Sequence, residues 1–289
     1  MNPGTPLDRT ALDSNPLPPI VDGGKESKGR ILIVAGSREV PGAALLVATA
    51  AMRAGAGKLR IATVASIAQQ VGMAMPEAMV IALPEHRRSG FARSAVKQIA
   101  DQAADADAIV AGPGVTHGET CRRIADRLLD SPARLALDAA LLRSLSPLEE
   151  DELERETMPV LLPHAGELAA LLDTGEDEVA AHPVRCGLRA AQLYRSVVLV
   201  KGVTSHVVHP DGRSWTYRGG APGLGVSGSG DVLAGIVGGL LSRGADPLAA
   251  LLWGVWLHGE AGAALAGKVA PIGFLAREIA DEIPALLPR

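Results

Sequence analysis

The chain has 289 residues, of which 47% are hydrophobic, 21% charged and 2% aromatic, with a net charge of -4 at pH 7. Its aliphatic content and low net charge exclude a disordered chain. The lack of a basic excess excludes a nucleic-acid binder that neutralises phosphates, and three Trp, two Tyr and two Phe are too few for a base-stacking platform.

Residues 1–27 are polar and rich in proline, which predicts an arm over the surface. They carry acids and prolines where a secretory signal would need an apolar segment. The longest apolar runs, such as 232–241, are about half the length that spans a bilayer. Cys121 and Cys186 have neither disulfide-framework nor metal-ligand spacing. We therefore expect a cytoplasmic protein that uses no membrane.

From residue 28 onward, short apolar runs alternate with helical patterns. Expected buried strands span 30–35, 58–64, 78–83, 107–111, 134–138, 159–162 and 197–201. Expected helices between them include 42–55, 120–129 and 184–194. Strands that alternate with helices indicate a mostly parallel sheet covered on both faces.

The pattern changes after residue 204. Segments 205–209 and 213–218 flank Asp211 and Gly212, a pair typical of hairpin turns. A Gly-rich stretch then precedes helices expected at 231–242, 247–266 and 274–286. Since there is no repeat and no linker, we predict one three-layer α/β/α domain over 28–289 behind the arm at 1–27.

The Gly-rich stretch 219–231, GGAPGLGVSGSGD, is the strongest chemical signal. Glycines let backbone N–H groups face one side, and a helix N-terminus adds free N–H groups, so the stretch predicts an anion cradle for a phosphate. No Lys-Ser/Thr pair follows, so it is not a Walker A loop. Asp231 either stabilises the helix start as a cap or first-turn acid, or serves as an acid/base carboxylate beside the phosphate.

Other suggestive residues follow the predicted strands. Each alone has a structural explanation: the glycines make turns, Asp138 caps a helix, His164 caps a helix together with Glu167, and Lys201 is a solvated strand end. In open parallel sheets, however, ligands bind at the carboxyl ends of the strands. The joint placement of these residues therefore predicts one ligand site: Gly36, Gly112, Gly114, Asp138, His164 and Lys201.

These motifs carry a resemblance to a known family. SGSGDVLAGIVGGLL (227–241) resembles the Gly-Thr-Gly-Asp anion-hole motif of the ribokinase-like superfamily. More closely, the chain resembles the ADP-dependent NAD(P)H-hydrate dehydratases of bacteria, in the family's order and spacing. The matching segments include KGRILIVAGS (28–37), IVAGPGV (109–115), LLPHAGE (161–167), VVLVKGVTSHVV (197–208) and WLHGEAG (256–262). The resemblance implies a ribokinase-like three-layer sandwich.

The resemblance also implies a reaction. The S-epimer of hydrated NADH or NADPH is dehydrated at the expense of ADP, with release of AMP and phosphate. The terminal phosphoryl group passes to the substrate hydroxyl, Asp231 takes the hydroxyl proton, and the phosphate is then eliminated. A Mg²⁺ that bridges phosphate oxygens, a homotetramer and a separate NAD(P)H-hydrate epimerase are implied as well, without a dedicated protein metal site.

The family's pattern assigns roles to matching positions of this sequence. The hydrated dinucleotide would contact Ala43, Gly114, His164 and Asp231. The adenosine nucleotide would contact Lys201, Gly202, Val203, Thr204, Ser205 and Gly230, and the anion hole would consist of Gly228, Ser229 and Gly230. The sequence departs from the pattern at Ser229, where Thr is usual, at Thr116, where Gly is usual, and at Ala221, where Asn is usual.

Two other functions remain open. An ATP-dependent ribokinase-like kinase of a small vitamin or sugar hydroxyl would share the anion cradle and Asp231, and a nucleotide-binding regulatory module could have lost catalysis. The segment PHAGE and residues 36–57 favour the dehydratase. The sequence does not decide between ADP and ATP, or between hydrated NADH and NADPH. The candidate rings for stacking on adenine are Trp215, Tyr217, Trp253 and Trp256, and core packing is the expected role of each.

Overall fold

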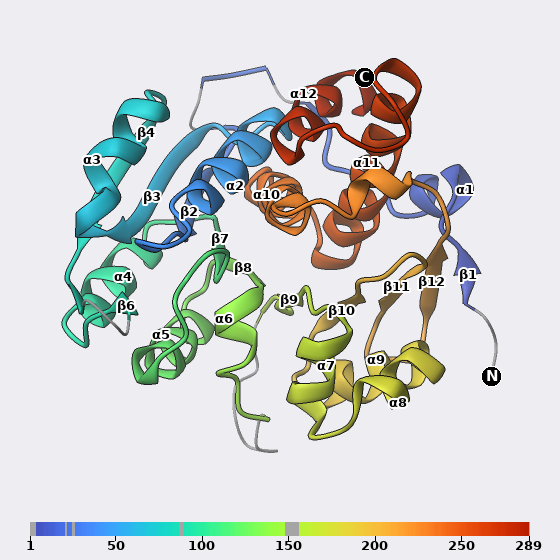
Figure 1. Ribbon diagram of the computed structural model, residues 1–289, viewed down its shortest axis with the longest axis horizontal. Helices are drawn as coiled ribbons and strands as arrows, with labels where there is room; N and C mark the ends of the chain where they lie inside the picture. The colour runs from blue at the N-terminus through green and yellow to red at the C-terminus, as the bar shows by residue number, and fades with distance from the viewer. Residues whose placement is uncertain (1–3, 21, 25–26, 87–89, 148–155, 289) are drawn as a thin grey trace.

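The computed structural model describes residues 4–20, 22–24, 27–86, 90–147 and 156–288. Its centre is a ten-stranded sheet in the order β1-β12-β11-β10-β9-β8-β7-β2-β3-β4. Helices α2, α10, α11 and α12 lie over one face, and α4, α5, α7 and α9 lie over the other (Figure 1). The predicted three-layer α/β/α arrangement is confirmed.

All expected strands are present. Pairing is parallel from β4 through β10, whereas β11 and β12 form the predicted antiparallel hairpin; β5 (Glu85–His86) and β6 (Gly90–Phe91) pair separately. The strands of the main sheet are β1 (Thr5–Pro6), β2 (Arg30–Val34), β3 (Lys58–Val64), β4 (Ala78–Leu83), β7 (Ala108–Ala111), β8 (Arg134–Leu137), β9 (Val160–Leu161), β10 (Val197–Val200), β11 (Ser205–Val208) and β12 (Ser214–Tyr217).

The helices follow the predicted ranges with small shifts at their ends. They are α1 (Arg9–Asp13), α2 (Gly42–Arg53), α3 (Ala65–Ala74), α4 (Ala95–Ala103), α5 (Glu119–Leu129), α6 (Ala139–Leu142), α7 (Ala165–Leu172), α8 (Glu176–Ala181), α9 (Pro183–Leu193), α10 (Ser229–Ser242), α11 (Pro247–Lys268) and α12 (Ala276–Leu286), with a 3-10 turn η1 at Pro222–Leu224.

The order of the strands reverses at β2. The chain places β3 and β4 on one side of β2, then returns to place β7, β8, β9 and β10 on the other side. Connections that leave the carboxyl edge in opposite directions open a crevice there, which is where ligands bind in such sheets. The reversal therefore indicates a ligand site at the loops that follow β2 and β7.

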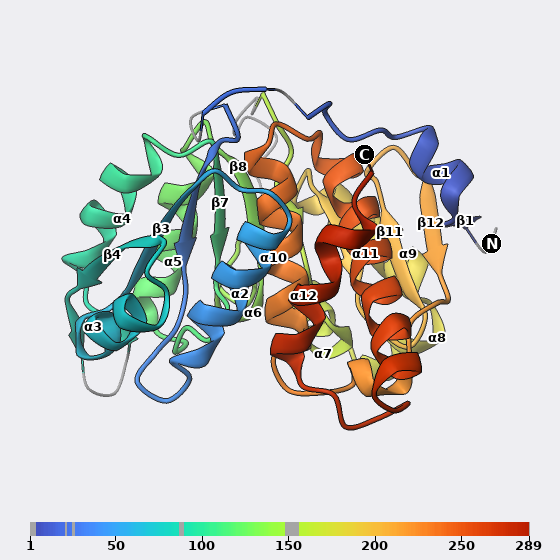
Figure 2. The same ribbon diagram turned by 90° about the horizontal axis from the view of Figure 1, so that it is seen from above.

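Helices α2 and α10 pack side by side through small residues (Figure 2). A Cβ added at Gly235 would lie 2.3 Å from the Val47 carbonyl oxygen, and one at Gly239 would lie 2.5 Å from that of Ala51. A Cβ at Gly238 would lie 2.1 Å from Val110 on the sheet. The glycines of α10 and the alanines of α2 are therefore needed for close approach of the two backbones.

Gly235→Ala is expected to lower the free energy of unfolding by about 1–3 kcal/mol, because α2 and α10 must separate to admit the methyl group. Gly267→Ala in α11 is the matched control, since no heavy atom lies within 4 Å of its added Cβ. Its better helix propensity should stabilise the protein by up to about 1 kcal/mol. Urea denaturation of both variants measures the difference, and equal stabilities would contradict tight packing at Gly235.

The N-terminal arm is anchored more firmly than its composition suggested. Strand β1 pairs in parallel with β12, and Leu12 of α1 is fully buried. The Arg9 guanidinium lies over Trp256 at 4.6 Å from the ring centroid and near Trp253, which contacts Trp256 edge-on. Cation–π contacts and sheet pairing hold residues 4–20 against α11 and the sheet edge.

Among the described residues, α11 is long and apolar enough to cross a membrane by length and composition alone. Its most apolar stretch has a mean hydropathy of 1.2, and 78% of that stretch is buried inside the molecule. There it packs against α10 and α12 (Figure 2). Central helices of compact domains meet the same criterion, and the burial of α11 is that of a core helix.

Candidate active site

The residues predicted at the strand ends do share one edge of the sheet. Gly36 follows β2, Gly114 follows β7, Asp138 follows β8, His164 follows β9, and Lys201 follows β10, in the order of these strands across the sheet. A bridge pairs His164 with Lys201, and the Lys201 N–H donates to the Pro163 carbonyl at 2.9 Å. The predicted common rim is confirmed.

The anion cradle lies at the start of α10, which begins at Ser229, two residues before the expected start. Gly228 is the N-cap, and its φ of +89° is in the region that favours glycine. The first N–H groups of a helix have no intrahelical acceptor. Outside its own helix turn, and within the described part of the chain, a Cβ added at Gly230 would have one neighbour within 4 Å, the Lys201 Nζ atom at 3.7 Å, so this side of the helix start is open.

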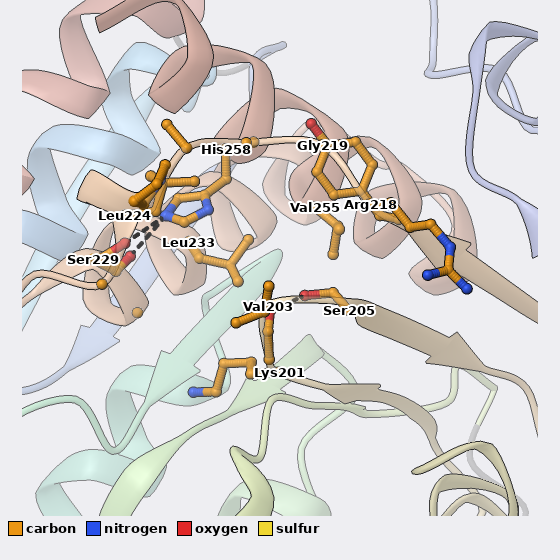
Figure 3. Close-up of a pocket in the computed structure, with 18 of the residues that line it drawn as sticks. Lys201, Val203, Ser205, Arg218, Gly219, Leu224, Ser229, Leu233, Val255 and His258 are labelled. Carbon is orange, nitrogen blue, oxygen red and sulfur yellow. Dashed lines mark hydrogen bonds between the residues drawn. The ribbon is translucent and has the colours of Figure 1, made fainter. Parts of the chain in front are cut away.

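A pocket of about 670 Å³ opens beside this helix start (Figure 3). Its walls come from the loop after β10, the end of β12, the Gly-rich stretch and α11. The predicted nucleotide residues that line it are Lys201, Gly202, Val203, Ser205 and Gly230. Thr204 does not line it, although it lies between two residues that do. The Val203 side chain is fully exposed at the pocket wall, where it offers an apolar surface.

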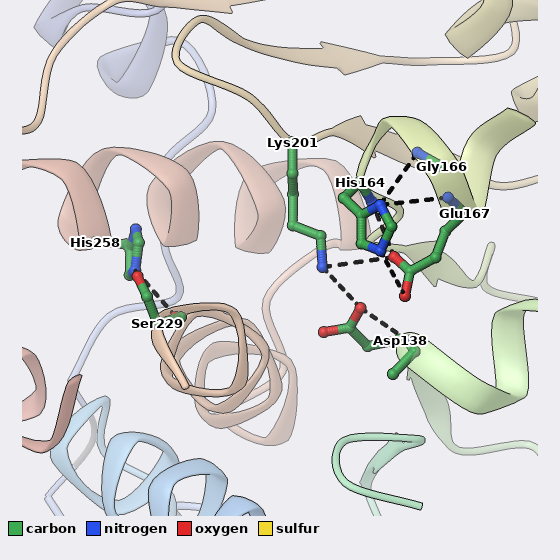
Figure 4. Close-up of polar contacts among 8 residues, drawn as sticks. Asp138, His164, Gly166, Glu167, Lys201, Ser229 and His258 are labelled. Carbon is green, nitrogen blue, oxygen red and sulfur yellow. Dashed lines mark hydrogen bonds and ion pairs between the residues drawn. The ribbon is translucent and has the colours of Figure 1, made fainter. Parts of the chain in front are cut away.

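Lys201 is not a solvated strand end, contrary to the simpler interpretation. Its side chain is 19% exposed, and its Nζ lies 2.8 Å from the Asp138 Oδ1 atom and 4.0 Å from a Glu167 carboxylate oxygen (Figure 4). Asp138 also accepts a hydrogen bond from the Ala139 N–H at 2.9 Å, so it caps α6 as expected. The lysine is thus held by two acids at the pocket's edge.

Asp231 lies in the first turn of α10 but does not cap the helix, since that position belongs to Gly228. Within the part of the chain that the structure describes, its carboxylate has no hydrogen bond. Burial and the negative charge of Asp138 raise the pKa of Asp231, Lys201 lowers it, and the net pKa is about 6. A carboxylate with this pKa is a stronger base than usual and is still mostly ionised at neutral pH.

Ala43 and Gly114 meet at the reversal of strand order. Gly114 has a φ of +64°, and a Cβ added to it would lie 2.5 Å from the Ala43 Cβ and 2.9 Å from the Val40 carbonyl oxygen. One turn along α2, Leu46 lies beside Gly228, whose added Cβ would be 3.9 Å from a carboxylate oxygen of Asp231. The start of α2, where Ala43 contacts Gly114, is therefore linked to the start of α10 through the contact of Leu46 with Gly228.

His164 caps α7 in a capping box. Its Nδ1 accepts hydrogen bonds from the N–H groups of Gly166 and Glu167, at 3.1 and 3.3 Å, while the His164 N–H donates to Glu167 at 2.9 Å (Figure 4). In the neutral ring the proton is then on Nε2. The His164 side chain is 61% exposed, and its Nε2 atom lies 3.5 Å from a Glu167 carboxylate oxygen.

Two departures from the family's motifs have structural consequences. The Thr116 hydroxyl donates to Glu39 at 3.3 Å, and Thr116 crowds Gly90, whose added Cβ would lie 3.1 Å from the Thr116 Cβ. Ala221 lines the nucleotide pocket without a polar group.

Of the four rings considered for stacking, Tyr217 alone is among the pocket-lining residues. Trp253 and Trp256 instead contact the Arg9 guanidinium.

His258 belongs to the segment WLHGEAG, and the prediction from the sequence assigned it no role. It lines the pocket, and its Nε2 lies 2.9 Å from the Ser229 Oγ atom. Glu260 accepts a hydrogen bond from the Tyr217 hydroxyl at 2.9 Å. The sequence signal that could have found these two residues is a polar side chain on a long apolar helix, because a buried polar group needs a hydrogen-bond partner.

The fold and the site define a class of enzyme. An anion cradle beside a pocket of about 670 Å³, a half-buried lysine at its edge and a nearby carboxylate with a raised pKa suit transfer of a phosphoryl group from a nucleotide. A family model described as NAD(P)H-hydrate dehydratase matches residues 31–285. The chain therefore belongs to the NAD(P)H-hydrate dehydratase family, and the ribokinase-like resemblance is confirmed.

The names of individual relatives agree with this family assignment. An ADP-dependent (S)-NAD(P)H-hydrate dehydratase from Xanthomonas campestris is 47% identical over 96% of this chain and 94% of its own length. A crystal structure of the ADP/ATP-dependent NAD(P)H-hydrate dehydratase of Bacillus subtilis, co-crystallised with ATP/Mg²⁺, has a TM-score of 0.85 at 27% identity and covers 99% of this chain and 98% of that one. A bifunctional NAD(P)H-hydrate repair enzyme from Moorella thermoacetica is 33% identical, and the chain spans half its length.

Proposed function

We propose that this protein dehydrates the S-epimer of hydrated NADH or NADPH to the intact cofactor, using ADP and releasing AMP and phosphate. The observation that carries the proposal is the Asp231 carboxylate, which caps nothing, has a pKa raised to about 6 and directly follows Gly230 of the pocket lining. Relatives at 47% and 30% identity named ADP-dependent (S)-NAD(P)H-hydrate dehydratase support it over the kinase.

In the proposed reaction, the helix start at Gly228, Ser229 and Gly230 and the Lys201 ammonium hold the terminal phosphoryl group. Asp231 takes the proton from the substrate hydroxyl as its oxygen attacks phosphorus, and the bond to the AMP oxygen breaks. The substrate then carries phosphate, a far better leaving group than hydroxide. The ring nitrogen's electron pair expels the phosphate, and the nicotinamide double bond re-forms with loss of a ring proton.

A Mg²⁺ fits this site as an ion held mainly by phosphate oxygens and water. Among the described residues, no group of three or more His, Cys, Asp or Glu side chains is placed to hold a metal. Asp138 is paired with Lys201, whereas Asp231 has no hydrogen bond among the described residues and would be the carboxylate available to such an ion. Bound Mg²⁺ would neutralise charge on the nucleotide, and such ions usually keep several waters.

One assay tests the function directly. The protein is incubated with hydrated NADH and either ADP or ATP, and the absorbance of regenerated NADH is followed. Faster regeneration with ADP is expected. Failure with both nucleotides in a folded sample would contradict the proposal, while phosphorylation of a vitamin or sugar hydroxyl by ATP would support the kinase.

The pH dependence of kcat/KM tests whether Asp231 is the base. The acid limb of kcat/KM should lie near pH 6, because Asp231 must be ionised and its pKa is raised to about 6. Asp138→Asn removes a like charge and frees Lys201, so the limb should move to lower pH; Lys201→Met removes the opposing positive charge, so it should move to higher pH. If neither variant moved the limb, another group would have to be the base.

Assembly and location complete the proposal. We propose a homotetramer in the cytoplasm that relies on a separate NAD(P)H-hydrate epimerase. The outer edge of β4, at the end of the sheet, and the exposed Met73 and Met79 support subunit contacts at this edge. Cys121 and Cys186 are buried free thiols, which is typical of reducing compartments. Size-exclusion chromatography with light scattering measures the oligomeric state.

A further inference from the structure

One buried contact joins the anion cradle to the opposite wall of the pocket. The Nε2 atom of His258, on α11, lies 2.9 Å from the Ser229 Oγ atom and 3.1 Å from the Ser229 carbonyl oxygen (Figures 3 and 4). Both residues line the nucleotide pocket. Ser229 is the first residue of α10, between Gly228 and the open backbone at Gly230.

The second distance fixes the direction of the first hydrogen bond. A carbonyl oxygen only accepts, so Nε2 must carry a proton to donate to the Ser229 carbonyl. A protonated Nε2 cannot accept a hydrogen bond from the Ser229 hydroxyl. The Oγ atom is therefore the second acceptor of the same N–H group, and the hydroxyl's own proton is not used by His258.

The imidazole keeps this arrangement over the physiological pH range. Burial and the positive charge of Lys201 lower the pKa of His258, the hydrogen bond to the Ser229 carbonyl raises it, and the net pKa is about 4. The ring is thus neutral, with one donor nitrogen that faces Ser229. Protonation of the ring therefore does not alter this contact near neutral pH.

We infer that His258 is a positioning residue, which occupies the acceptor side of the Ser229 hydroxyl and leaves its proton to donate to the terminal phosphoryl oxygen of the bound nucleotide. The inference rests on the proposed function in one respect, namely that the phosphoryl group bound here is the terminal one of ADP. It gives a reason why Ser, with the same hydroxyl, can replace the family's usual Thr at position 229. A donor set in advance needs no reorganisation when charge develops on the phosphoryl group.

Binding of ADP and AMP separates this role from a merely structural one. AMP lacks the terminal phosphoryl group, so His258→Leu should weaken ADP binding about tenfold in calorimetry and leave AMP binding unchanged. His258→Gln places an amide N–H at similar reach and should bind ADP nearly as well as the unaltered protein. Equal losses for ADP and AMP, or equal losses in the Leu and Gln variants, would overturn the inference.

A double-mutant cycle tests that His258 acts through Ser229. Ser229→Ala should reproduce the ADP-specific loss, and the double variant Ser229→Ala, His258→Leu should lose little more than either single variant. Additive losses would overturn the inference. If His258→Leu fails to fold, His258→Asn replaces it as the variant without the hydrogen bond, because the Asn side chain is one carbon shorter than that of Gln. Because these readouts use nucleotide binding, they remain decisive even if the dehydration assay fails.

Discussion

Asp231→Asn is expected to lower the turnover number about a thousandfold while the dissociation constant for ADP changes less than about threefold. Asn has the shape of Asp but cannot take the hydroxyl proton, and the Asp231 carboxylate makes no capping hydrogen bond that the change would break. Turnover of hydrated NADH and calorimetric ADP binding measure the two effects. Retained turnover would remove Asp231 from the role of base.

The same variant should gain stability, which separates loss of chemistry from loss of fold. The pKa of Asp231 is raised in the folded protein to about 6 from 3.8, so its ionisation opposes folding above pH 4 and does so fully above pH 6. Asp231→Asn should therefore raise the free energy of unfolding by roughly 2 kcal/mol at neutral pH and have little effect below pH 4.

Asp246→Asn is the matched control for this comparison. Asp246 caps α11 by accepting hydrogen bonds from the N–H groups of Leu248 and Ala249. Asn caps a helix about as well as Asp, so turnover and stability should both stay close to those of the unaltered protein. A large loss of turnover in this variant would mean that acid-to-amide changes harm the enzyme nonspecifically.

The parallel strands were predictable because their signal is local. Runs such as 58–64 and 78–83 are apolar, and each occupies its predicted range. The start of α10 was misplaced because Ser229 and Gly230 resemble loop residues, whereas Gly228, with its positive φ, already ends the loop. The docking of the arm was not predictable, since β1 pairs with a strand some 200 residues away.

The site shows why structural and functional explanations need not exclude each other. Asp138 and His164 cap helices, as the simpler interpretation holds, and both also lie on the ligand rim. In a parallel sheet each helix begins just after a strand, so caps and ligand contacts use the same positions. The pairing of Lys201 with Asp138 joins residues 63 positions apart, which no local pattern encodes.

Gly230→Val is expected to weaken ADP binding at least about tenfold, and the corresponding Ala variant to weaken it less. The added side chain would fill the space between the start of α10 and the Lys201 ammonium, where a phosphate must approach the backbone N–H groups. Among the described residues outside its own helix turn, Lys201 Nζ, at 3.7 Å, is the one heavy atom within 4 Å of the new Cβ, so the Cβ itself meets no fixed backbone of a neighbouring element.

Stability distinguishes this steric exclusion from misfolding. Gly is the poorest helix former apart from Pro, so Gly230→Val and the control Gly267→Val should both leave the free energy of unfolding unchanged or slightly higher. Gly267 is on α11 with open space around its Cβ, away from the pocket lining, so that control should bind ADP normally. Normal ADP affinity in Gly230→Val would show that the terminal phosphate does not reach the start of α10. In that case the anion cradle would have to be sought elsewhere on the rim.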